Sequence, residues 1–260
     1  MSEFWTSEKL ENYKRASEYT AFHKRLSVLA EPYLDENWTM ADLGCGPGLI
    51  DFHLAPMVRH ITAIDNDSLA ISDLQARLDD VFQTNKYVAD RITPVLGDVR
   101  TLTDELWDIV LLSFFGTDKE LLDGVLPRAK KRAIIYAHGR QEAYGSEPLP
   151  DNTDDAKFDA HDIETYLAAN HYAFKKNVLE MQFGQPFKTI EDIHAFLDKY
   201  GGGDRHLSCI DLGGVDAFDD DAIKRMTDAE ERIVKTDRFD YPYYLPKSIS
   251  VALFIVVMKA

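Results

Sequence analysis

The stretch that most limits how this chain can fold is Thr39 to Gly48, which reads TMADLGCGPG. A short apolar run ends close to an acid, glycines follow at alternate positions, and a segment of helical character begins at Leu49. A second apolar run, ITAI, ends at Asp65. Strand, glycine loop, helix and acid-tipped strand in this order are typical of α/β sheets that bind a nucleotide at the carboxyl ends of their strands.

The spacing of the glycines distinguishes two classes of cofactor. A dinucleotide fingerprint, G-x-G-x-x-G, would require glycine at position 49, where the chain has Leu49. The pattern from Asp42 to Gly48 is instead D-x-G-x-G-x-G, and it resembles the first motif of the class I S-adenosylmethionine (SAM)-dependent methyltransferases. The resemblance extends over the order of elements from about Thr39 to Tyr136. A nicotinamide-dependent oxidoreductase is therefore a disfavoured alternative.

The resemblance implies a set of cofactor-binding residues. In that family the glycine loop holds the methionine part of SAM, and the acid that ends the second strand holds the ribose. An acid after the third strand takes the adenine amino group, and the next residue packs on the ring; Asp98 and Val99 stand there, although Asp98 can also cap a short helix. The full expected set is Tyr13, Asp42, Gly44, Cys45, Gly46, Gly48, Asp65, Asn66, Asp98, Val99 and Ser113.

Aromatic residues of the N-terminal segment form a second group of candidates, because aromatic faces attract cations such as a sulfonium. They are Phe4, Trp5, Tyr13 and Tyr19, of which Tyr13 is preferred because the Trp5–Tyr13 spacing resembles cap segments of the family. The alternative is plain packing against the sheet.

His138 is the candidate catalytic base, because it follows a predicted strand over 133–137 and an imidazole titrates near neutral pH. A structural histidine bonded to a loop carbonyl is the alternative. We expect no metal site. His206, Cys209 and Asp211 carry possible ligand atoms, but they lack the paired spacing of a zinc site.

The predicted fold is a doubly wound α/β domain with a Rossmann-like, mostly parallel seven-stranded sheet whose last strand is antiparallel. The whole chain, 1–260, is read as one domain. We expect a helical cap over 1–37, the core over 38–186, a helical lid insertion over 187–245, and the last strand over 246–260.

Composition narrows the partners. The formal net charge of −16 argues against nucleic acid and against an anionic membrane surface, and no apolar run is long enough for a membrane helix. Two cysteines in 260 residues do not make a disulfide framework, which favours a reducing cytoplasm. We therefore predict methyl transfer from SAM to a small-molecule acceptor. The alternative is a protein of this fold that binds SAM without transfer, and the oligomeric state stays open.

Overall fold

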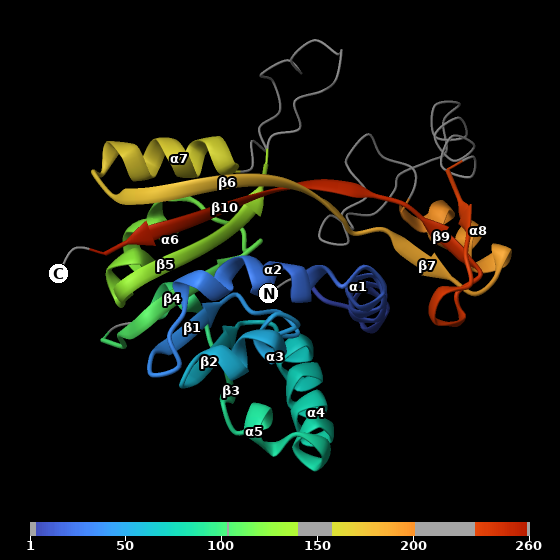
Figure 1. Cartoon of the computed structure of the whole chain (residues 1–260), viewed down its shortest axis with the longest axis horizontal. Coiled ribbons are helices and arrows are strands. Elements are labelled where there is room, and N and C mark those ends of the chain that lie inside the picture. Colours follow the sequence, from blue (N-terminus) through green and yellow to red (C-terminus); the bar gives the residue numbers. More distant parts are fainter. Residues whose placement is uncertain (1–3, 103, 140–157, 201–231, 259–260) are drawn as a thin grey trace, which may run out of the picture. The chain divides into compact units, whose positions relative to one another are not determined.

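The computed structural model describes residues 4–102, 104–139, 158–200 and 232–258 (Figure 1). The chain divides into two compact units, which are described separately. The first contains residues 1–5, 23–180 and 249–260, and the second contains residues 6–22 and 181–248.

The first unit is built on a seven-stranded sheet with the order β3-β2-β1-β4-β5-β10-β6. β1 pairs in parallel with β2 and β4, β2 with β3, and β4 with β5, whereas β10 runs antiparallel to β5. This topology confirms the predicted fold class. The strands are β1 (Thr39–Leu43), β2 (His60–Asp65), β3 (Ile92–Leu96), β4 (Trp107–Ser113), β5 (Ala129–His138), β6 (Ala173–Gln182) and β10 (Ser248–Val257).

Both faces of this sheet are covered, which explains the almost continuous apolar character of β4 and β10. On one face, alternate strand residues pack against α6 and α7 in a single buried cluster. On the other face, the Tyr136 hydroxyl donates to the Leu26 carbonyl of α2 at 2.7 Å. The helices are α2 (Phe22–Ala30), α3 (Asp51–Leu54), α4 (Ser68–Thr84), α5 (Lys86–Ala89), α6 (Lys119–Val125) and α7 (Ala160–Ala169).

Specific residues set two of the helix ends. The N-terminal helix is interrupted at Ala21, whose φ of 53° ends α1 (Ser7–Thr20). Asp67 caps α4, because its carboxylate accepts the N–H groups of Leu69 and Ala70. Among the described residues, no helix combines the length and apolarity needed to cross a membrane.

The second unit contains α1, α8 (Ile190–Tyr200) and a three-stranded antiparallel sheet with the order β7-β9-β8. The strands are β7 (Gln185–Phe187), β8 (Val234–Lys235) and β9 (Tyr243–Leu245). Phe187 and Leu245 join two residues of α8 in a small buried core. The expected helical insertion is thus partly a sheet, while its residues 201–231 lie outside the described part of the chain.

Candidate functional site

The carboxyl edge of the parallel strands brings most of the predicted site residues to one side of the sheet. β1 runs into the glycine loop, β2 ends at Asp65, and β3 leads into Asp98. β4 ends at Ser113 and β5 at His138. Since these five strands are parallel neighbours, their carboxyl ends meet at the edge where α/β sheets bind ligands.

The glycine loop has a backbone that other residues adopt only under strain. Gly44, Gly46 and Gly48 have φ values of 76°, 54° and 64°. A Cβ on Gly44 would lie 2.0 Å from the ring of Phe115. The N–H groups of Gly44 and Cys45 donate to the Ile64 carbonyl at 2.8 and 3.1 Å, which holds the loop beside the end of β2.

Asp65 anchors this loop through its carboxylate. Its Oδ2 accepts the Gly46 N–H at 2.7 Å, and its Oδ1 accepts the Asp67 N–H at 2.8 Å. The side chain is only 8% exposed, and burial raises the pKa of Asp65 against the opposing effect of these N–H groups. A carboxylate oxygen can accept more than one hydrogen bond, so both oxygens of Asp65 can also accept one from a ligand hydroxyl.

The end of β3 is tied to the same point, since the Gly97 N–H donates to the Asp65 carbonyl at 2.9 Å. The next residue, Asp98, is exposed, and its Oδ1 accepts the Arg100 N–H at 2.9 Å. The helix-capping alternative for Asp98 is therefore confirmed, and it leaves the second carboxylate oxygen for other partners. Val99 is buried at 6% exposure.

Trp5 is the N-terminal aromatic residue that the structure places at the glycine loop. Its backbone N–H donates to Asp67 Oδ2 at 3.0 Å, and its ring lies 3.2 Å from the position of a Cβ on Gly46. From the sequence, Trp5 was one of four aromatic candidates, and Tyr13 was the preferred one. Tyr13 belongs to the second unit, where its ring meets Phe183 edge-on at 5.5 Å, and its role at the cofactor stays a prediction.

Asp42 and Asp51 form a buried pair of carboxyl groups that the sequence did not predict. Both are 0% exposed, and none of their four oxygens accepts a hydrogen bond from a donor within the described residues. The two groups lie within hydrogen-bonding reach of each other, and burial, followed by Asp51, raises the pKa of Asp42 well above its usual range. An acid just after a glycine loop was the available signal, but it reads equally well as a helix-start residue.

Cys45 lies inside the loop as a free cysteine. Its thiol contacts the Gly46 carbonyl at 3.4 Å. Burial, and then the carboxylates of Asp42, Asp51 and Asp65, raise the pKa of Cys45. The thiol therefore stays protonated and is a poor nucleophile.

His138 is exposed at the end of β5, where it pairs in register with Val251. Its ring lies 4.9 Å from the ring of Phe114, the residue that follows β4. Phe114 has a φ of 52°, which is strained for a bulky side chain, and its N–H donates to the Tyr136 carbonyl at 2.9 Å. Strained backbone of this kind is concentrated at functional sites.

No cluster of three or more possible metal ligands occurs in the described ranges. The three possible ligands named from the sequence lie outside those ranges; they are His206, Cys209 and Asp211.

Comparison with known proteins gives likeness at the level of structure. No family model matches the sequence, and neither does any curated protein. The YcgJ protein of Bacillus subtilis superposes with a TM-score of 0.55 at 12% identity, covering 92% of this chain and 99% of its own. A magnesium protoporphyrin IX methyltransferase from Synechocystis, solved with bound S-adenosylhomocysteine (SAH), gives 0.54 at 11% identity and covers 97% and 95%. A SAM-dependent methyltransferase from Aquifex aeolicus gives 0.50 at 16%, covering 67% and 92%.

The chain has the class I methyltransferase fold. At these identities the likeness concerns the fold, and the site must be judged on its own residues. The glycine loop has a backbone that suits glycine, with Asp65 bonded to Gly46 and Asp51 of the buried acid pair beside Gly48. SAM carries a sulfonium and an ammonium group, so a loop surrounded by three carboxyl groups fits the cofactor of this fold.

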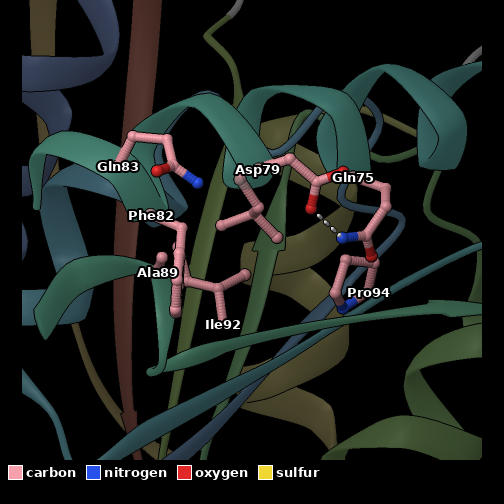
Figure 2. A pocket seen from close by; sticks show the side chains of 8 residues that line it. Gln75, Asp79, Phe82, Gln83, Ala89, Ile92 and Pro94 are labelled. Atoms are coloured by element: carbon pink, nitrogen blue, oxygen red, sulfur yellow. Dashed lines mark hydrogen bonds between the residues drawn. The ribbon is translucent and has the colours of Figure 1, made fainter. Parts of the chain in front are cut away.

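A cavity of about 250 Å³ lies elsewhere on the methyltransferase fold, between α4, α5 and the first half of β3 (Figure 2). Gln75 donates to Asp79 at 2.9 Å, the dashed line in Figure 2, and Phe82 and Ile92 are among the apolar residues of the lining. None of the predicted site residues lines this cavity, and its lining contains no serine, threonine, cysteine, histidine, lysine or arginine.

Proposed function

We propose that this chain is a SAM-dependent methyltransferase that transfers a methyl group to a small-molecule acceptor by direct in-line displacement. One observation carries the proposal: three glycines in left-handed conformations form a loop at the carboxyl edge of the sheet, and Asp65 accepts the N–H of the middle one, Gly46. When bound, SAM supplies a methyl group activated by its sulfonium, so the protein mainly has to bind and orient.

The residues divide this work among them. The loop from Gly44 to Gly48 lets the methionine part of SAM approach the backbone closely, and Asp65 accepts the ribose hydroxyls. Asp98 accepts the adenine amino group with its remaining carboxylate oxygen, while Val99 supplies an apolar surface for the ring. We assign the neighbouring Asn66 and Ser113 to the same site, on their places at the ends of β2 and β4.

His138 is proposed as the base that takes a proton from the acceptor. Its place at the end of β5 supports this role, because the parallel strand β4 beside it ends at the same edge. The proposal applies only to an acceptor whose nucleophilic atom carries a proton with a high pKa. A His138→Gln variant should then lose turnover while it keeps its affinity for SAH.

A small acceptor is supported by charge. With 45 acidic and 29 basic residues, the chain lacks the excess of lysine and arginine on which nucleic-acid binding depends. The choice among oxygen, nitrogen, sulfur and carbon acceptors depends on residues that the pattern of the sequence does not specify.

The test is transfer of labelled methyl from SAM to a panel of small phenols, amines, thiols and carboxylic acids. We expect wild-type protein to label at least one class and Asp65→Ala to lose this labelling. Asp80→Ala is the matched control, because Asp80 is an exposed carboxylate of α4. Binding of SAH without transfer to any acceptor would favour the alternative, a protein of this fold that binds SAM without turnover.

A further inference from the structure

The Asp42–Asp51 pair joins the two ends of the glycine loop. Asp42 is the last but one residue of β1, just before the loop, and Asp51 is the first residue of α3, just after it. Asp51 Oδ2 lies 3.0 Å from the position of a Cβ on Gly48, so the pair is directly against the loop backbone. Any ligand that rests on this loop is therefore close to two buried carboxyl groups.

The carboxyl oxygens of the pair can form a hydrogen bond only if one of the two groups keeps a proton. Ionised carboxylates accept hydrogen bonds but donate none, and no other donor in the described part of the chain reaches the four oxygens. Two buried like charges in contact repel strongly, so one proton shared between them is the stable arrangement. Burial raises the pKa of Asp42 and also that of Asp51.

The charges around the pair favour keeping that proton in the free protein. Asp65 of β2 and the thiol of Cys45 add no positive charge. Arg77 of α4 is the cation that acts on Asp51, but its guanidinium also donates to the Pro47 carbonyl of the loop at 2.9 Å.

Two histidines stand near Arg77 and stay neutral. Burial is the main effect that lowers the pKa of His23, to about 3, and it also lowers the pKa of His53. Lys24 and Arg77 act on His53 in the same direction. Neither histidine adds a positive charge to that of Arg77. A cation brought by a ligand would therefore be an additional positive charge near the pair.

We propose that Asp51 is a positioning residue that shares one proton with Asp42, and that this proton leaves when a ligand bearing an α-ammonium group binds on the glycine loop. The proton passes to solvent, and the second negative charge of the pair is then offset by the ligand's ammonium. Binding of SAH is thereby coupled to proton release, and its affinity rises with pH. This inference rests on the proposed function, because it takes the amino-acid part of SAH to lie on the loop.

The test is calorimetric titration of the full chain with SAH between about pH 6 and pH 8.5, in phosphate and in Tris, whose ionisation enthalpies differ. We expect affinity to rise by up to about tenfold per pH unit, the limit for one released proton. The difference in heat between the buffers should report the same proton. 5′-Methylthioadenosine, which lacks the amino-acid part, should bind without pH dependence or proton release.

Asp51→Asn and Asp42→Asn keep the size of each group and replace the shared proton with an amide N–H. Either variant should abolish the proton release and flatten the pH dependence. Asp80→Asn, on the exposed face of α4, should keep both. If one amide variant fails to fold, the other variant and the two-buffer measurement on wild-type protein still decide the outcome.

The titration distinguishes failure of the shared-proton inference from failure of the proposed function. If SAH binds with the same affinity at every pH and releases no proton, or if the amide variants keep the full pH dependence, the shared-proton inference is wrong and the proposed function stands. If SAH does not bind at any pH, both are wrong.

Discussion

Replacing Asp65 with alanine should destabilise the folded chain as well as weaken cofactor binding. The Asp65 carboxylate accepts two backbone N–H groups, from Gly46 at 2.7 Å and from Asp67 at 2.8 Å. Both of these residues are themselves buried. Truncation to alanine therefore leaves two buried N–H donors without their acceptor.

The size of the effect follows from these two hydrogen bonds. A hydrogen bond to a charged group contributes about 1.5–3 kcal/mol, and an orphaned buried donor costs about 1–3 kcal/mol. The variant also removes the cost of burying Asp65, which is visible in the raised pKa of its carboxyl group. We expect a net loss of about 2–4 kcal/mol in the free energy of unfolding, and at least a tenfold loss of SAH affinity, which is about 1.4 kcal/mol.

Urea unfolding followed by circular dichroism measures the first quantity, with Asp98→Ala as the matched control. Asp98 is exposed and accepts a single backbone N–H, so its loss should cost about 0.5–1 kcal/mol. The reasoning would be refuted if Asp65→Ala were no less stable than Asp98→Ala. In that case the carboxylate would not be holding the glycine loop.

Three further predictions concern the loop, the sheet and the buried acids. Gly44→Ala combines a φ of 76° with a ring 2.0 Å from the new Cβ, so urea unfolding should show a loss of at least about 2 kcal/mol, whereas Gly116→Ala, with open space around it, should stay within about 0.5 kcal/mol. Tyr136→Phe removes a buried hydroxyl that donates at 2.7 Å and should cost about 1–2 kcal/mol; a thermal midpoint equal to that of wild type would contradict this. Because the folded pKa of Asp42 is raised, its contribution to stability is full below the unfolded pKa of about 4 and is lost as pH rises toward the folded pKa. Asp51→Asn should reduce that fall in urea unfolding at a series of pH values, and an unchanged fall would exclude the pair as its source.

The sequence predicted the main sheet because its strands carry their own signals. β1, β2 and β4 are short apolar runs with an acid at or next to one end, and the glycine loop fixes how the first two connect. The small sheet of the second unit has no such signal. β7 is three residues long and includes Pro186, and it pairs with β9, which lies almost sixty residues further along the chain. Local pattern does not reveal a pairing of this kind.

The site shows the same division between local and distant information. Asp65 was predicted because the acid at a strand end has a fixed place relative to the glycine loop. Trp5 reaches the loop through a hydrogen bond to Asp67, which lies 62 residues away, so its selection over Tyr13 needed the folded structure. The Asp42–Asp51 pair needed the folded structure too, because only the structure shows that both acids are buried and that no donor in the described part of the chain reaches their oxygens.

Calorimetric titration of cofactor-free protein with SAH, with NAD as the control, tests the central claim most directly. The glycine spacing and the conformation of the loop around Gly46 predict that SAH binds and that NAD does not. Binding of NAD in place of SAH would show that Leu49 does not exclude a dinucleotide and that the assignment is wrong. If neither ligand bound, the glycine loop would be a structural turn, and the proposal of a methyltransferase would be contradicted.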